Sequence, residues 1–203
     1  MLRAAVRLAD EGGIQALSMR KVAQELGVEA MSLYNHVANK DDMLAGIVEL
    51  VAGEIDLAGD EPDWKAATRR RALSTHEVLL RHSWAAGIWM STGSPGPARF
   101  RHGDAILRGF REAGFSEGLT YHGFHVLQGH VIGYTLYATG FRFDAAELDE
   151  LAAAFLRDFP AAEYPDLAEH IRQHMEPGDE HGSTFEFGLD LILDGLERLR
   201  DRA

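Results

Sequence analysis

Apolar residues recur along this chain at the spacing of α-helices almost from one end to the other. No run alternates between apolar and polar residues with the period of two that a half-buried strand requires. Stretches rich in glycine, proline and polar residues interrupt the helical pattern at residues 12–13, 59–63, 91–97 and 176–182. The pattern therefore predicts an all-α protein.

Capping residues mark where the predicted helices begin and end. Ser18, Asn39 and Ser116 stand directly before periodic stretches, where a side-chain oxygen can accept a hydrogen bond from an unpaired backbone N–H. Gly27 follows such a stretch and suits a left-handed turn. The predicted helices span residues 2–11, 19–26, 30–37, 39–56, 64–82, 84–90, 98–113, 117–141, 144–158, 165–175 and 183–200.

Residues 18–37 contain two short amphipathic helices that are joined by a turn of three or four residues. This spacing is typical of a helix-turn-helix that reads DNA. The alternative is a helical hairpin with a polar exterior, and periodicity alone does not separate the two. The predicted inward positions are Met19, Val22, Ala23 and Leu26 on the first helix, and Ala30, Leu33, Tyr34 and Val37 on the second.

The outward face of the second short helix carries side chains that suit base edges. Asn35 can bind adenine through two hydrogen bonds, Ser32 is adaptable, and Met31 can contact a thymine methyl group. Lys40, at the start of the next helix, can hold a phosphate together with the backbone N–H groups there. These residue types favour a DNA-reading role for the segment.

The segment LSMRKVAQELGVEAMSLYNHVANKDDML, residues 17–44, resembles the DNA-binding signature of the TetR (tetracycline-repressor) family. The resemblance implies a ligand-responsive transcriptional regulator, a repressor that a small-molecule effector releases from a palindromic operator. It also implies that Tyr34 and His36 contact phosphates or nearby bases, and that Ala30 and Asn35 stand where family members vary their base-reading side chains. The predicted DNA-contacting residues are Ser18, Arg20, Ala30, Met31, Ser32, Tyr34, Asn35, His36 and Lys40.

Residues 185–197, FEFGLDLILDGLE, resemble the last helix of a tetracycline-repressor type of C-terminal domain. Each glycine in a helix costs up to about 1 kcal/mol of helix stability, so glycines on one face indicate the close approach of another backbone. The helix predicted at 117–141 also carries glycines, at 129, 133 and 140. This helix and the last one, from each of two protomers, would form an intersubunit four-helix bundle, although packing within one chain is the alternative. The predicted interface residues are Gly129, Gly133, Gly188, Leu191, Ile192 and Gly195.

The same resemblance places an effector pocket inside the C-terminal domain. Gly129-His130 is similar to a Gly-His pair of the tetracycline repressor whose histidine helps to bind the magnesium of the drug. Trp89, Arg71 and Thr75, however, depart from the drug-contacting pattern, and the large aromatic side chains favour a larger apolar or aromatic effector. Plain core packing is the alternative for each aromatic residue. The pocket candidates are Thr75, Trp84, Trp89, Met90, Phe110, His125, Gln128 and His130.

The charge distribution affects the expectation of DNA binding. The formal net charge of −12 argues against a nucleic-acid partner when it is taken alone. Residues 1–45, however, contain five basic and six acidic residues, so that a charge of −11 lies in residues 46–203. We therefore expect a helix-turn-helix DNA-binding domain at 1–45 and an acidic ligand-binding and dimerisation domain at 46–203.

Two other functional classes compete with a DNA-binding regulator. One is a metal-dependent enzyme that uses the histidine-rich helices, where His122 and His125 share a face. No Ser–His–Asp arrangement, HExxH motif or glycine-rich phosphate loop supports it, so no catalytic residue, metal or required cofactor is predicted. The other is a helical dimer that has lost its DNA contacts, which the retention of Tyr34, His36 and Lys40 argues against.

The absence of cysteine and of any signal peptide or apolar span favours the cytoplasm. Operator DNA, a small-molecule effector and a second copy of the chain are the expected partners.

Operator binding by this chain is predicted to be weak and sensitive to salt. TetR family members usually carry a basic arm before the first helix, whereas this chain begins at Met1-Leu2-Arg3. Fewer phosphate contacts lower the affinity, and the remaining contacts are lost as salt competes for the phosphates. A titration of operator affinity against salt measures this, with a variant that carries an added basic arm expected to recover binding. Tight binding that is indifferent to salt would refute the prediction.

Overall fold

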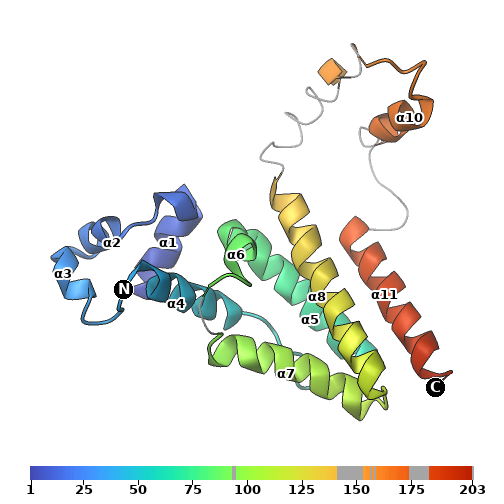
Figure 1. Ribbon diagram of the computed structural model, residues 1–203, viewed down its shortest axis with the longest axis horizontal. Coiled ribbons are helices and arrows are strands. Elements are labelled where there is room, and N and C mark those ends of the chain that lie inside the picture. Colours follow the sequence, from blue (N-terminus) through green and yellow to red (C-terminus); the bar gives the residue numbers. More distant parts are fainter. Residues whose placement is uncertain (93–94, 141–152, 156, 158, 174–182, 203) are drawn as a thin grey trace.

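The computed structural model describes residues 1–92, 95–140, 153–155, 157, 159–173 and 183–202, and the regular elements in these ranges are all helical (Figure 1). This confirms the predicted all-α class. The predicted helix 144–158 lies mostly outside the described residues. The elements are α1 (Leu2–Gly12), the short 3-10 helix η1 (Ile14–Ala16), α2 (Met19–Leu26), α3 (Ala30–Leu33), α4 (Lys40–Ala52), α5 (Trp64–Arg81), α6 (Ser83–Ile88), α7 (Pro97–Glu112), α8 (Glu117–Gly140), α10 (Pro165–Gln173) and α11 (Thr184–Arg200).

Local capping sets the ends of α2 and α4 as the sequence predicts. The Ser18 hydroxyl accepts a hydrogen bond from the backbone N–H of Lys21, and the Asn39 side chain accepts one from Asp42 at 2.8 Å. Gly27 ends α2 in the left-handed conformation, with φ of 66°. The second short helix is a correction, because α3 ends at Leu33, earlier than predicted. Tyr34, placed inward by the periodicity, is 46% exposed.

Helix α4 lies in an apolar cluster that the helix-turn-helix shares with α5, α6 and the start of α7. Its residues Ile47, Val48 and Val51 are fully buried in one apolar cluster that includes residues from α1, α2 and α6. The predicted division between residues 45 and 46 therefore lies inside a continuous helix. Any movement of α4 changes the position of the helix-turn-helix relative to the rest of the chain.

The C-terminal half is built around α5, α8 and α11, which lie against one another (Figure 1). An aromatic group of Trp64, Phe110 and Phe115 closes one end of this core, with ring centroids 4.8–5.9 Å apart. Ion pairs then run along the seam between α5 and α11. Lys65 contacts Asp194 and Glu197, and Arg69 contacts Glu186 and Asp190, at 2.6–2.8 Å. These pairs are partly exposed, so they set the register of the two helices more than their stability.

A single carboxylate on α4 holds the start of α7. Glu49 accepts hydrogen bonds from the backbone N–H groups of Gly96 and Ala98 and from Arg99 Nε, at 2.7–2.9 Å. A side chain at Gly96 would overlap the Glu49 carboxyl group, since a Cβ there would lie 2.6 Å from it. Arg99 also donates to the carbonyl oxygens of Trp89 and Thr92. We call these contacts the Glu49 clamp, which joins α4 to the α6–α7 region.

Replacing Glu49 by glutamine should lower the free energy of unfolding by about 2–3 kcal/mol, because it removes the negative charge from a carboxylate that accepts three hydrogen bonds, one of them from the buried Arg99. Burial raises the pKa of Glu49, but the bonds from Arg99, Ala98 and Gly96 outweigh it and leave the pKa below the usual 4.5. A lowered folded pKa means that this stabilisation is present above pH 4.5 and is lost as the pH falls through the folded value.

Urea unfolding of wild type and Glu49→Gln at neutral pH and at low pH measures both effects. Glu25→Gln is the matched control, since Glu25 forms an exposed pair with Arg7 and should change stability by about 0.5 kcal/mol or less. Equal stability of wild type and Glu49→Gln at neutral pH would contradict the prediction.

Candidate functional site

The predicted DNA-contacting residues gather around α3. Met31, Tyr34, Asn35, His36 and Lys40 are exposed, and Lys40 is the first residue of α4. The first turn of α2, with Ser18 and Arg20, lies at the start of the helix that packs against α3. The N-termini of α2 and α4, which favour anions, thus precede and follow in the chain the short helix that would read bases.

Two of these residues are partly occupied by contacts within the chain. The Ser32 hydroxyl donates to the carbonyl oxygen of Glu29 at 2.7 Å, so it helps to form the first turn of α3. Ala30 is half-buried beneath the same turn. The side chains left fully available on α3 and just beyond it are Met31, Tyr34, Asn35 and His36.

A polar network joins α1 to the beginning of α6. The Asp10 carboxylate accepts a hydrogen bond from the Trp84 indole N–H at 2.7 Å and lies 2.8 Å from His82 Nδ1. His82 Nε2 faces Glu54, at 3.4 Å, beyond the end of α4. Trp84, a pocket candidate from the sequence, is therefore a contact between the two halves of the chain and lines no cavity described below.

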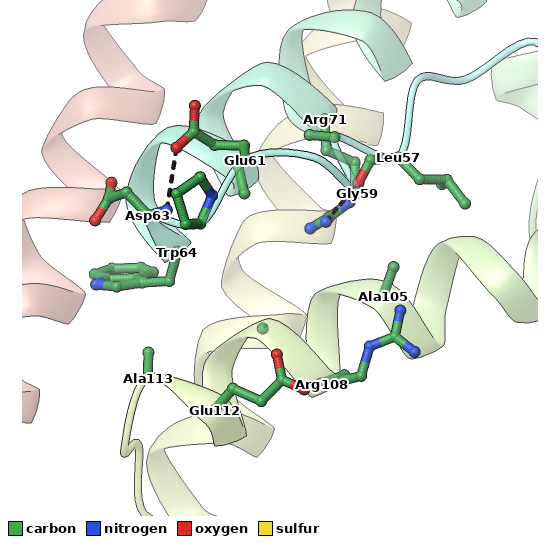
Figure 2. Close-up of a pocket in the computed structure, with 14 residues that line it drawn as sticks. Leu57, Gly59, Glu61, Asp63, Trp64, Arg71, Ala105, Arg108, Glu112 and Ala113 are labelled. Carbon is green, nitrogen blue, oxygen red and sulfur yellow. Dashed lines mark hydrogen bonds between the residues drawn. The ribbon is translucent and has the colours of Figure 1, made fainter.

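An open cleft of about 380 Å³ lies between the connection 57–63, α5 and α7. Figure 2 shows Trp64, Asp63 and Ala113 at one end of the cleft and Leu57, Arg71, Ala105 and Arg108 at the other. Arg71 is only 5% exposed, and its Nε and Nη2 donate to the carbonyl oxygen of Leu57 at 3.1 and 2.7 Å. Burial and the charge of Arg108 lower the pKa of Arg71, with Asp56 opposing them.

Behind Arg71, a closed seam runs between α5, α7 and α8 and leaves no room for a water molecule. Thr75 and Gln128, both predicted from the sequence, line it together with Thr68, Arg71 and His102. His102 is 3% exposed, and neither ring nitrogen makes a hydrogen bond of good geometry. Burial lowers the pKa of His102 to about 4, which the charge of Arg71 assists and the Gln128 side chain opposes. His102 is therefore neutral at pH 7.

The sequence prediction missed His102 as a pocket residue, although a signal was available. His102 stands within the buried stripe of α7, where Ala98, Ala105, Ile106 and Phe110 occupy the neighbouring positions at helical spacing. A polar residue at a core position of an amphipathic helix needs a partner when it is buried. That need points to a ligand or to an internal hydrogen bond, and periodicity does not distinguish them.

The remaining pocket candidates do not meet in one place. Trp89 is buried, with its ring 6.2 Å from that of His102, so it adjoins the seam. Phe110 belongs to the aromatic group with Trp64 and Phe115. Met90 is 82% exposed and lines no described cavity, because it follows the last turn of α6 on its outer side.

The two histidines of α8 that were predicted to line the pocket also lie apart from the seam. His125 is exposed, and its Nδ1 contacts the Tyr121 carbonyl oxygen at 2.8 Å. His130 stacks on Phe185 and contacts the Phe185 carbonyl oxygen at 2.9 Å, which places it against the first turn of α11.

The outer faces of α8 and α11 are apolar and exposed. Val126, Leu136 and Tyr137 on α8 and Phe187 and Leu191 on α11 are at least 43% exposed. A Cβ at Gly129, Gly133 or Gly195 would meet no atom of the described residues within 4 Å beyond the adjoining turns of its own helix, so the described packing within one protomer gives no reason for these glycines.

The remaining interface candidates, Gly188 and Ile192, differ. At position 188, packing within one protomer is enough to require glycine, because a Cβ there would lie 2.6 Å from His130 Cε1. Ile192 is half-buried against the core of its own chain.

Within the described residues, no three histidine, aspartate or glutamate side chains come close enough to hold a metal ion. Nor does any described helix have the length and apolar character that crossing a membrane requires.

Comparisons with known proteins match the chain from end to end. Residues 1–47 match the family described as "Bacterial regulatory proteins, tetR family", and residues 58–200 match "Tetracyclin repressor-like, C-terminal domain". The chain belongs to the TetR family. The tetracycline repressor protein class A from transposon 1721 of Escherichia coli is 31% identical to this TetR family chain, across 98% of this chain and 90% of its own length.

Solved structures give the same assignment for both halves of this TetR family regulator. A possible TetR family transcriptional regulator from Streptomyces coelicolor A3(2) has a TM-score of 0.80 and 31% identity, covering 98% of this chain and 97% of its own. The Streptomyces coelicolor TetR family protein ActR in complex with actinorhodin has a TM-score of 0.80 and 26% identity, covering 98% and 95%.

Membership confirms the function class that the sequence predicts. The chain is a ligand-responsive, DNA-binding transcriptional regulator of the repressor type, and it acts as a dimer. Its relatives are transcriptional regulators and not enzymes.

His102 predicts a distinctive dependence of stability on pH. Because its pKa is lower in the folded chain than the usual 6.5, stability is fully present above pH 6.5 and is lost as the pH falls towards 4. At pH 5 the loss should reach about 2 kcal/mol, since one pKa unit corresponds to about 1.4 kcal/mol.

Replacing His102 by glutamine should remove this contribution, so the stability of wild type should fall more steeply between pH 7 and pH 5 than that of the variant. His76, whose pKa is lowered by burial and by His130, contributes to both proteins and cancels in the difference. His122→Gln, at an exposed position, is the control and should follow wild type. Parallel pH profiles for wild type and His102→Gln would rule out a buried, neutral His102.

Proposed function

We propose that this TetR family regulator binds a palindromic operator as a dimer and is released when an aromatic effector opens the seam between α5, α7 and α8. The Glu49 clamp is the observation that carries the proposal. It ties α4, which leads into the helix-turn-helix, to the N-terminus of α7 and, through Arg99, to Trp89 and Thr92. The Trp89 ring lies 6.2 Å from that of His102, which lines the seam.

The mechanism follows from that connection. A ligand that separates α5, α7 and α8 displaces the start of α7, and the clamp passes the displacement to α4. A few ångströms of change in the separation of two recognition helices removes their register with successive major grooves. The effector must bind the displaced state more tightly than the operator-bound state, commonly by about 1–3 kcal/mol.

The residue roles that we propose on the DNA side follow the exposed face around α3. Asn35 and Met31 read bases, while Tyr34, His36 and Lys40 contact phosphates or nearby bases, with support from Ser18 and Arg20. Dimerisation through the outer faces of α8 and α11, with Gly129, Gly133 and Gly195 at the close approach, would pair two such heads.

The aromatic character of the effector rests on the residues near the seam and on a relative. Trp64 lines the cleft, Phe110 packs against Trp64, and the Trp89 ring lies 6.2 Å from that of His102 in the seam. The relative ActR has been solved with actinorhodin. We further propose that residues 1–45 bind DNA and that residues 46–203 bind the effector and dimerise. We also propose that the protein regulates transcription without a required cofactor and that it works in the cytoplasm.

Fluorescence anisotropy with the intergenic DNA upstream of the gene tests the DNA side. Lys40→Gln should weaken binding to all DNA sequences and reduce by about one the slope of the logarithm of the binding constant against the logarithm of the salt concentration. Asn35→Ala should lower the free energy of operator binding by about 1–3 kcal/mol and relax the preference for one sequence. Arg101→Gln is the control, because Arg101 is an exposed residue of α7 that lines neither the cleft nor the seam. Failure of wild type to bind any such DNA at low salt would overturn the proposed repressor function.

A thermal-shift screen of aromatic small molecules tests the effector side. A compound that binds in the seam should raise the melting temperature and, at the same concentration, weaken operator binding. A compound that stabilises the protein through the seam and leaves operator affinity unchanged would contradict release by displacement of α4.

A further inference from the structure

Arg71 is a buried cation without a carboxylate partner. Its two neighbours on α5 are each paired, Arg69 with Glu186 and Asp190, and Arg70 with Asp56 and Asp60. In the described part of the chain, Arg71 forms no ion pair and donates only to the carbonyl oxygen of Leu57. A buried charge of this kind is costly unless an opposite charge meets it.

The charges nearest to Arg71 increase this shortage of negative charge. Arg108 repels Arg71, and the attraction of Asp56 is shared with Arg70, whose guanidinium lies 2.6 Å from that carboxylate. Three acidic residues line the cleft: Glu112 on α7 forms no ion pair with Arg71 among the described residues, while Glu61 accepts from the N–H of Asp63 and Asp63 accepts from Ala66. Figure 2 shows Glu61 and Asp63 at the Trp64 end, away from the Arg71 guanidinium. Arg108 forms an exposed pair with Asp104 at 3.7 Å, so Arg71 is the cation of the cleft that an anion would meet unpaired.

His102 supplies an independent sign of a missing ligand on the other side of Arg71. It lines the same seam as Arg71, and both of its ring nitrogens lack a hydrogen-bond partner of good geometry. Thr68 and Thr75 donate to the Trp64 and Arg71 carbonyl oxygens, and neither hydroxyl accepts from the ring. Gln128 is near enough to oppose the lowering of the His102 pKa, but it makes no hydrogen bond of good geometry with the ring. A neutral imidazole can donate one hydrogen bond, and a carboxylate oxygen is a suitable acceptor.

We propose that the effector is an aromatic organic acid whose acidic group is bound by Arg71 and by the ring N–H of His102. This rests on the proposed function of an effector-released repressor. The acid reaches Arg71 through the cleft, whose volume of about 380 Å³ is within the range of small-molecule sites. The ring system lies along the apolar wall of Trp64, Ala67, Ala105, Gly109 and Ala113.

Binding of the acid also weakens a contact that holds the connection after α4. The guanidinium that pairs with the acid is the one that now donates to Leu57. A carboxylate competes well with a neutral carbonyl oxygen for a guanidinium, since charge-assisted hydrogen bonds are roughly twice as strong as neutral ones. The acid therefore loosens residues 53–63, the segment between α4 and α5.

Matched pairs of acid and amide test the proposal directly. The probes are benzoate, naphthoate and anthraquinone carboxylate, each beside its primary amide, which keeps the shape and removes the charge. Calorimetry and thermal shift with the full chain should show that at least one acid binds wild type about tenfold or more tightly than its amide, as expected for a charged hydrogen-bonded pair. Arg71→Gln should abolish that preference, while Arg71→Lys should keep part of it.

Two controls separate a binding role from a structural one. Arg101→Gln removes an exposed charge of α7 and should keep the preference for the acid. His102→Gln retains a donor and should bind the acid more tightly than His102→Leu. Circular dichroism of each variant confirms that it is folded.

The outcomes divide clearly. No acid preference in wild type, or a preference that survives in Arg71→Gln, overturns the acid site while leaving the repressor function intact. An acid that binds through Arg71 but leaves operator affinity unchanged supports the acid site and contradicts the proposed mechanism of release.

Discussion

The carboxylate of Glu49 is the interaction on which the arrangement of this molecule depends. Helix α4 lies in one apolar cluster that joins the DNA-reading head to α5, α6 and the start of α7, so its position sets how the two halves meet. Glu49 fixes that position by accepting two backbone hydrogen bonds at the start of α7 and a third from Arg99. Because the same arginine holds the carbonyl oxygens of Trp89 and Thr92, the end of α6 and the start of α7 share one anchor.

The proposed effector site is placed where it can act on that anchor. Trp89 lies beside His102, and its carbonyl oxygen accepts from Arg99, which binds Glu49 of α4. Arg71 donates to Leu57 in the connection that follows α4, so both contacts link the seam to α4. The seam is closed, so a ligand whose ring system lies in the open cleft must still separate packed helices before its acidic group reaches His102. Buried groups with unmet charge or hydrogen bonds supply part of that gain, because the ligand satisfies them in the open state only.

The sequence predicts well those features that depend on neighbours in the chain. The cap at Ser18, the left-handed turn at Gly27 and the all-helical class follow from local rules and are confirmed. The spacing of apolar residues predicts that Tyr34 faces inward, because it assumes that the helix continues to Val37. Helix α3 ends at Leu33, however, and Tyr34 is exposed.

The pocket was harder to predict. Thr75 and Gln128 do line one seam, but periodicity identifies a buried face and not the partner that faces it, so His125 and His130 were grouped with residues that they do not meet. The long-range contacts of Glu49 and the isolation of Arg71 leave no trace in local pattern.

The distance between the two DNA-reading heads of the dimer tests the central claim most directly. The chain has no cysteine, so a single Gln24→Cys substitution on the exposed side of α2 carries one spin label in each protomer. Electron–electron distance measurements on the labelled dimer should give one narrow distribution with Glu49 present, and a displaced or broadened one after Glu49→Gln. Identical distributions for the two proteins would contradict the account that the Glu49 clamp sets the position of the heads.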